Sequence, residues 1–78
     1  MGLTVYSTSW CGYCHRLAKQ LDREGVRYTY VDIEQDPEAA EFVMGVNGGN
    51  QTVPTVVFDD GTALTNPSLQ TVLLRLSA

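Results

Sequence analysis

The chain has 78 residues, of which 44% are hydrophobic and 18% charged, and a formal net charge of −4. This length suits one domain, over residues 1–78, and the composition argues against disorder. The acidic balance argues against nucleic acid as a partner, and no apolar run approaches the roughly 20 residues of a membrane-spanning helix. Because the first residues lack a secretion signal, we expect a cytoplasmic protein whose two cysteines are reduced and reactive.

The first half of the chain alternates between strand and helix patterns. Residues 3–8 are β-branched and aromatic, which favours a strand. Cys14 begins a helical repeat of apolar residues that Gly25 ends, and residues 27–32 alternate like a second strand. The pair Asp36-Pro37 is typical of a helix start. The apolar residues expected to be buried on these two helices are Cys14, Leu17, Ala18 and Leu21, then Ala39, Phe42, Val43 and Val46.

The second half predicts a hairpin followed by a last helix. A polar loop over residues 47–52 leads to a third strand at 55–58. The turn signal Asp59-Asp60-Gly61 then predicts a fourth strand near 62–64. The pair Asn66-Pro67 repeats the cap and proline of a helix start. The last helix is expected to bury Leu69, Val72, Leu73 and Leu76.

The order of these elements is β-α-β-α-β-β-α, which predicts an α/β fold. The first two strands enclose a helix, so they are expected to be parallel and joined by a right-handed crossover. The hairpin is then expected to pair antiparallel beside the first strand. The result is a four-stranded mixed sheet flanked by three helices that cover both faces.

Cys11 and Cys14 lie where the first strand ends and the first helix begins. Unpaired N–H groups and the positive end of the helix dipole favour a thiolate at that junction, and the thiolate is the nucleophile. Cys11 is expected at an exposed tip, where it attacks. Cys14 belongs to the buried face one turn later, close enough to form a disulfide with Cys11. We therefore predict a redox-active pair rather than two inert core cysteines.

The same residues also fit two other kinds of site, which we considered as alternatives. The run Cys11-Gly12-Tyr13-Cys14-His15 also fits covalent haem attachment, with Met44 as axial ligand, but the chain has neither an export signal nor an all-helical pattern. A zinc site of Cys11, Cys14 and His15 lacks a fourth ligand at a usual spacing, so we expect no metal. His15 is expected either near the thiolate or on the solvated helix surface.

Over essentially the whole chain the sequence resembles the glutaredoxins, which have the thioredoxin fold. The order of elements, Trp10-Cys11-Gly12-Tyr13-Cys14 and Thr52-Val53-Pro54 carry this resemblance. In that family the proline is cis and lies against the cysteines. The resemblance implies that Val53 presents backbone groups beside Cys11, on which an extended disulfide substrate adds as a strand. It also implies that Trp10 and Tyr13 wall the substrate groove, although Trp10 also fits a packing role.

The sequence resembles one subgroup of the glutaredoxins more than the others. Glutaredoxins that use glutathione typically carry Gly-Gly-x-Asp between the fourth strand and the last helix, where residues 64–67 are Leu-Thr-Asn-Pro. Residues 46–50 and 65–67 instead resemble the mycoredoxins, which work with mycothiol, a cysteine-containing pseudo-disaccharide. Thr65 and Asn66 are then expected to hydrogen-bond sugar or inositol hydroxyls. Capping of the last helix is the alternative role of Asn66.

The resemblance implies a thiol–disulfide oxidoreductase that reduces S-mycothiolated proteins by a monothiol mechanism, with mycothiol as co-substrate and no bound cofactor. A separate NADPH-dependent reductase recycles mycothiol disulfide, and we expect a monomer. Cys14 forms an internal disulfide with Cys11 that protects it from over-oxidation. Two alternatives remain open. One is a dithiol redoxin that donates electrons to ribonucleotide reductase, and the other is a glutaredoxin-type binder of an iron–sulfur cluster, which Gly12 permits.

Overall fold

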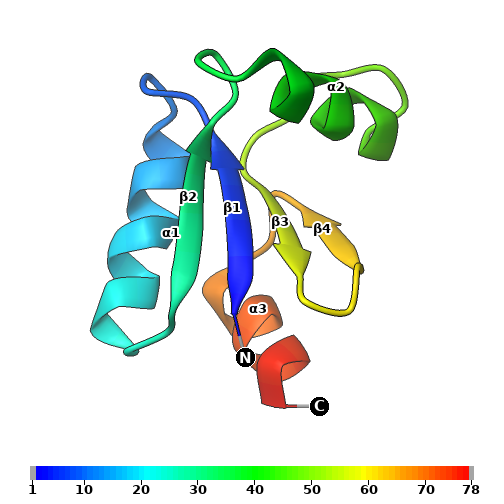
Figure 1. Cartoon of the computed structure of the whole chain (residues 1–78). Coiled ribbons are helices and arrows are strands. Elements are labelled where there is room, and N and C mark those ends of the chain that lie inside the picture. Colours follow the sequence, from blue (N-terminus) through cyan, green and yellow to red (C-terminus); the bar gives the residue numbers. More distant parts are fainter. Residues whose placement is uncertain (1, 78) are drawn as a thin grey trace.

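A computed structural model describes residues 2–77 (Figure 1). Alternating side chains of β1 (Leu3–Ser7) are buried, because successive residues of a strand point to opposite faces of the sheet. The other strands are β2 (Tyr28–Asp32), β3 (Thr55–Phe58) and β4 (Ala63–Thr65). The helices are α1 (Gly12–Arg23), α2 (Pro37–Val46) and α3 (Leu69–Ser77). The predicted order of elements is confirmed.

The four strands form one mixed sheet in the order β2-β1-β3-β4. β1 runs parallel to β2, with Val5 opposite Tyr30, and antiparallel to β3, with Val5 opposite Val56. β4 pairs antiparallel with β3 across the turn at Gly61, whose φ of 90° favours glycine. The parallel crossover and the hairpin beside the first strand are as predicted.

The helices form two layers, one on each face of the sheet (Figure 1). On one face, α1 and α3 bury a large cluster made of Leu3, Val5, Leu17, Leu21, Val56, Phe58 and Val72. On the other face, α2 covers a smaller cluster made of Ile33, Ala39 and Val43. Within residues 2–77, no helix is long and apolar enough to cross a membrane.

The predicted start of the last helix at Asn66-Pro67 is wrong. The helix begins at Leu69, and the Ser68 hydroxyl accepts the Thr71 N–H at 3.2 Å, as an N-cap does. Asn66 has a φ of 48°, and its N–H donates to the Pro54 carbonyl at 2.7 Å. Asparagine tolerates this left-handed conformation, so the residue makes a turn instead of capping the helix.

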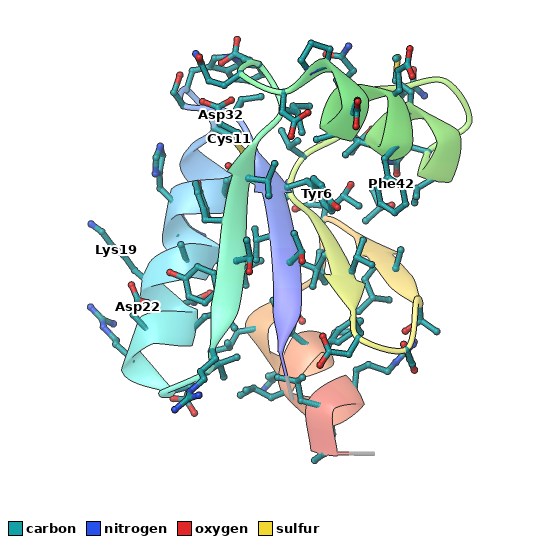
Figure 2. All side chains as sticks on the ribbon, viewed as in Figure 1. Tyr6, Cys11, Lys19, Asp22, Asp32 and Phe42 are labelled. Atoms are coloured by element: carbon teal, nitrogen blue, oxygen red, sulfur yellow. The ribbon has the colours of Figure 1, made fainter. Side chains whose placement is uncertain are left out.

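Phe42 and Val46 were also predicted incorrectly, since they are 44% and 39% exposed. The buried stripe of α2 contains only Ala39 and Val43, because this helix packs on a small part of the sheet. Phe42 lies instead at the margin, where its ring is 5.3 Å from that of Tyr6 (Figure 2). Of the apolar residues predicted for the last helix, Val72 is fully buried, and Leu69, Leu73 and Leu76 are half-buried.

Candidate active site

Cys11 caps the N-terminus of α1, just after the turn that follows β1. Its Sγ accepts a hydrogen bond from the Cys14 N–H at 3.2 Å. An acceptor in this position satisfies one of the unpaired N–H groups of the helix and lies at the positive end of the helix dipole. The arrangement makes Cys11 both the cap of α1 and the residue at the positive end of its dipole.

Cys11 is more enclosed than predicted. The sequence indicates an exposed tip, but only 6% of the residue is exposed. It lies at the end of the sheet where β1 and β2 finish (Figure 2), and the loop before β3 covers it. Its thiol donates to the Val53 carbonyl at 4.0 Å, a long contact for a sulfur donor. The enclosure therefore comes from a segment 42 residues away, which helix periodicity does not detect.

Cys14 is fully buried, one helical turn after Cys11, and both cysteines are free thiols. Burial, followed by the side-chain hydrogen bond with Cys11, raises the pKa of Cys14 to about 12. Cys14 is therefore protonated at neutral pH, and the two thiols are not equivalent as nucleophiles.

The raised pKa of Cys14 predicts a loss of stability in alkali. Below its ordinary value of 9.0, the thiol is protonated in the folded and unfolded chains alike, so it contributes no pH dependence. Between pH 9.0 and about 12, the unfolded chain releases this proton and the folded chain retains it. The free energy of unfolding should then fall by up to about 1.4 kcal/mol per pH unit. Urea unfolding of the wild type and of Cys14→Ala across this range measures the effect, and equal slopes would contradict it.

The loop of residues 52–54 lies beside Cys11. The peptide bond between Val53 and Pro54 is cis, as the resemblance implies. The Thr52 carbonyl accepts the Thr55 hydroxyl at 2.8 Å, and the Pro54 carbonyl accepts the Asn66 N–H. Val53 lies outside the strands, between two residues whose carbonyls are fixed by the fold. Its backbone is therefore held next to the Cys11 sulfur.

Trp10 and Tyr13 flank Cys11 and are 72% and 66% exposed, so Trp10 is not a packing residue. The Trp10 indole N–H donates to Glu34 Oε2 at 3.2 Å, and the Ser9 hydroxyl donates to Glu34 Oε1 at 3.3 Å. Glu34, which was not among the predicted site residues, thus holds the turn before Cys11. Nothing in the local sequence indicates this contact, because it joins two loops.

His15 is exposed on α1 and does not contact the Cys11 sulfur. Its Nε2 lies 2.9 Å from the Ser9 carbonyl, and its ring stacks on Tyr30 with 6.5 Å between centroids. His15 therefore ties the helix to the turn that precedes it. Within residues 2–77, no three His, Cys, Asp or Glu side chains are placed to hold a metal ion together.

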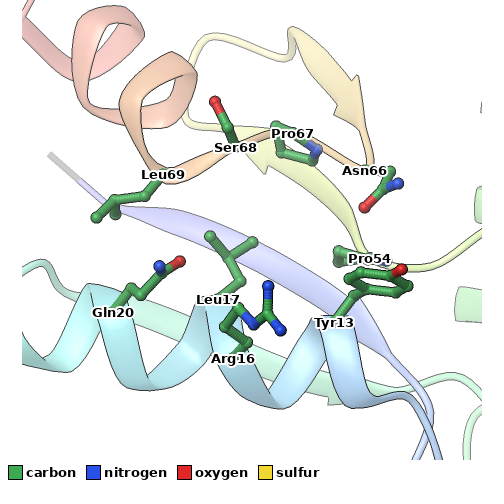
Figure 3. A pocket seen from close by; sticks show the side chains of 9 residues that line it. All are labelled: Tyr13, Arg16, Leu17, Gln20, Pro54, Asn66, Pro67, Ser68 and Leu69. Atoms are coloured by element: carbon green, nitrogen blue, oxygen red, sulfur yellow. The ribbon is translucent and has the colours of Figure 1, made fainter.

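A cavity of about 270 Å³ lies between α1 and the segment that joins β4 to α3 (Figure 3). One wall comes from α1 and the other from residues 66–69, with Pro54 at the end nearest Tyr13. Tyr13 lies between the two cysteines in the chain, and Pro54 follows Val53, so the cavity is next to Cys11. Its lining residues are Tyr13, Arg16, Leu17, Gln20, Pro54, Asn66, Pro67, Ser68 and Leu69.

The structure brings only some of the predicted substrate residues to this cavity. Tyr13, Pro54 and Asn66 line it. Trp10 is directed to Glu34 instead, and the Thr65 hydroxyl donates to Asn47 Oδ1. Thr52 and Val53 belong to the loop beside Cys11 and do not line the cavity.

The cavity is also lined by Arg16, Gln20 and Ser68, which were not predicted as substrate residues. The sequence does contain a pattern that could have identified Arg16 and Gln20, the two residues on α1. Arg16 follows Tyr13 by three positions and Gln20 follows Arg16 by four, so all three share one helix face. Ser68 carried no such signal, because its place depends on where α3 begins.

These features define a class of protein: a domain with a free cysteine at a helix N-terminus, a second buried cysteine and a cis-proline loop beside them. Comparison with known proteins agrees. The glutaredoxin family profile matches residues 3–62. Mycoredoxin 1 of Corynebacterium glutamicum is 47% identical over 76 residues, which cover 97% of this chain and 94% of that protein. A glutaredoxin-type protein of Mycobacterium tuberculosis is 58% identical over 74 residues, which cover 95% of this chain and 88% of that protein.

A solved structure shares the same thioredoxin-like fold. The glutaredoxin-like protein NrdH-redoxin from Escherichia coli superposes with a TM-score of 0.79 over 95% of this chain and 93% of that one, at 22% identity. The chain therefore belongs to the glutaredoxin family, whose members are thiol–disulfide oxidoreductases.

Proposed function

We propose that the protein reduces protein–mycothiol mixed disulfides by a monothiol cycle in which Cys11 is the nucleophile. The cavity beside Cys11 carries this proposal. It offers the neutral hydrogen-bonding groups of Gln20, Asn66 and Ser68 and a single cation, Arg16. Such a lining suits a thiol rich in hydroxyl groups better than glutathione, which has two carboxylates. The 47% identity with a mycoredoxin supports the same substrate.

The cycle has two thiol–disulfide exchanges. In the first, the Cys11 thiolate attacks the mycothiol sulfur of the mixed disulfide, forming a Cys11–mycothiol disulfide. The protein thiolate leaves and takes up a proton. In the second, the thiolate of another mycothiol attacks the mycothiol sulfur of the adduct, which releases Cys11 as thiolate and yields mycothiol disulfide. A separate reductase returns that disulfide to two thiols with two electrons from NADPH.

The Val53 backbone is the proposed docking edge for the protein part of the substrate. In the thiol form, Cys11 donates to the Val53 carbonyl. When Cys11 ionises, this donor is lost, and the carbonyl becomes available to an N–H of an extended substrate segment. Ionisation of the nucleophile and opening of the docking edge are thereby linked. Tyr13 and Trp10 are the proposed walls on either side.

The state of Cys14 favours the monothiol cycle. Only a thiolate resolves an adduct, and burial raises the pKa of Cys14 to about 12, so free mycothiol competes well with it at neutral pH. A dithiol redoxin that donates electrons to ribonucleotide reductase is the second candidate. The placement of the two cysteines one helical turn apart favours it, because the Cys11 sulfur already accepts the Cys14 N–H at 3.2 Å.

We also infer that the protein acts in the cytoplasm as a single-domain monomer without a bound cofactor. Mycothiol and S-mycothiolated proteins are the proposed partners. The reductase of mycothiol disulfide is an indirect partner, because it meets only the product.

A coupled assay with NADPH tests the choice of thiol. One S-thiolated protein is reduced with mycothiol and its reductase, and with glutathione and glutathione reductase, at equal concentrations of thiol. We expect mycothiol to support a rate at least about tenfold higher, because a site built for hydroxyl groups rejects a ligand that leaves its polar groups unpaired. Equal rates would make the protein a general glutaredoxin.

Asn66→Gly provides the control that links the preference to the cavity. Glycine accepts the left-handed φ of 48°, so the turn is kept while the amide side chain is removed. The rate with mycothiol should fall toward the rate with glutathione. A preserved preference would place thiol recognition outside this cavity.

A further inference from the structure

A chain of side-chain hydrogen bonds leads from β4 to the loop beside Cys11. The Thr65 hydroxyl donates to Asn47 Oδ1. Asn47 Nδ2 in turn donates to Thr55 Oγ1 at 3.1 Å. The Thr55 hydroxyl then donates to the Thr52 carbonyl at 2.8 Å. Thr55 is fully buried, so a lost partner cannot be replaced by bulk water.

Asn47, the C-cap residue of α2, fixes which group donates and which accepts in this series of hydrogen bonds. Its Nδ2 lies 2.8 Å from the Val43 carbonyl, which can only accept a hydrogen bond. The amide nitrogen must therefore face Val43 and Thr55. Thr55 Oγ1 accepts from this nitrogen, so its single proton is directed to Thr52.

We propose that Asn47 and Thr55 are positioning residues for the substrate. The Thr52 carbonyl and the Val53 N–H belong to the same peptide unit, which is planar. Holding the carbonyl on one side therefore sets the direction of the N–H on the other. This inference rests on the proposed docking of an extended substrate at Val53. It gives Asn47 and Thr55 a role in binding and none in the chemistry of Cys11.

Four variants separate this role from general stability. Thr55→Val keeps the shape and removes the hydroxyl, and Thr55→Ser restores the hydroxyl. Asn47→Asp replaces the amide donor by a carboxylate oxygen, which accepts the Thr55 proton and draws it away from Thr52. Thr62→Val is the matched control, because it removes a threonine hydrogen bond to Asp60, of 2.7 Å, in the turn between β3 and β4.

The probe is a short peptide whose cysteine is joined to cysteamine by a disulfide, together with the same peptide carrying thioamides in place of the two amide carbonyls that flank that cysteine. A thioamide sulfur is a weaker acceptor than a carbonyl oxygen, so the second peptide pairs poorly with the Val53 N–H. The third probe, bis(2-hydroxyethyl) disulfide, has no backbone at all. Attack of the reduced protein on the cysteamine sulfur forms a Cys11–cysteamine disulfide and releases the peptide thiol. Its release in a single turnover gives a limiting rate and a half-saturation concentration.

We expect the wild type to need several-fold less of the plain peptide than of the thioamide peptide. Thr55→Val and Asn47→Asp should raise the half-saturation concentration of the plain peptide roughly five- to tenfold and lose this discrimination. The limiting rate and the rate with bis(2-hydroxyethyl) disulfide should change by less than about twofold, since no reacting atom is touched. Thr55→Ser and Thr62→Val should behave like the wild type.

Three results would overturn the proposal in distinguishable ways. If the wild type does not distinguish the two peptides, docking at Val53 itself is wrong, and the positioning role falls with it. If the wild type distinguishes them and Thr55→Val does so equally well, docking stands but the hydrogen-bond chain does not position it. If Thr55→Val loses activity equally on the peptide and on bis(2-hydroxyethyl) disulfide, Thr55 serves stability alone.

Discussion

Cys11→Ser should lower the rate of mixed-disulfide reduction by roughly a thousandfold or more. A serine hydroxyl is not ionised at neutral pH, and its oxygen does not exchange with a disulfide sulfur, so the first step of the cycle is lost. The fold should survive, because serine is a preferred N-cap residue and can accept the Cys14 N–H that Cys11 Sγ accepts at 3.2 Å. The measurement is the coupled NADPH assay with a protein–mycothiol mixed disulfide.

The same N-cap provides a control for this variant. Cys11→Ala removes both the nucleophile and the cap, so it should be equally inactive but less stable than Cys11→Ser by about 1 kcal/mol. Thermal unfolding of the two variants separates loss of chemistry from loss of structure. Activity in Cys11→Ser above a few per cent of the wild type would assign the attack to another group.

Cys14→Ser should keep substantial activity toward protein–mycothiol mixed disulfides. In the proposed cycle only Cys11 bonds to mycothiol, and free mycothiol resolves that bond. Because the variant cannot close the internal disulfide, it should accumulate the Cys11–mycothiol adduct when reductant is limiting. It should also lose the reduction of a protein's internal disulfide, which requires a second thiol to resolve the protein–protein intermediate. Intact-mass analysis detects the trapped adduct, and the coupled assay, run once with a mixed disulfide and once with a protein's internal disulfide, measures the two activities.

A buried serine can itself disturb the site, so Cys14→Ala serves as a second variant with no polar atom to satisfy. Both variants should form the same adduct. If both are as inactive as Cys11→Ser toward mixed disulfides, the monothiol mechanism is wrong. The dithiol redoxin, in which Cys14 completes every turnover, would then be favoured.

Most of the fold was predictable because its determinants are local. The helix start at Asp36 depends on a side chain that accepts the Ala39 N–H three residues later. The end of α1 depends on Gly25, whose φ of 69° requires no tertiary partner. Strand order then followed from connection rules that apply to any chain with these elements.

The errors lie where distant contacts decide. Asparagine is a residue type that often caps helices, but the Asn66 N–H donates to the Pro54 carbonyl and fixes a turn there. Phe42 has the spacing of a core residue, but α2 covers too little of the sheet to bury it. Cys11 is enclosed by the loop at Val53, which no local pattern around the cysteine indicates.

The candidate site was predictable in its chemistry and less so in its walls. The spacing of Cys11 and Cys14 after a strand is sufficient to predict one cysteine at the helix start and a buried one a turn later. The proposed positioning roles of Asn47 and Thr55 could not be predicted from the sequence, because their hydrogen bonds join α2, β3 and the loop before β3. The ligand role that the resemblance implies for Thr65 stays a prediction, and the hydrogen bond from its hydroxyl to Asn47 was not foreseen.

The recessed position of Cys11 also limits which disulfides can reach its sulfur. With 6% of the residue exposed and Trp10 and Tyr13 projecting beside it, the sulfur is reached only by a disulfide carried on a protruding or flexible segment. A small thiol attached to a surface cysteine meets this requirement, and a disulfide packed inside another folded protein does not. In the proposed cycle, this shape selects thiol adducts on exposed segments over buried structural cross-links, and the selection depends on accessibility and not on the sequence of the substrate protein.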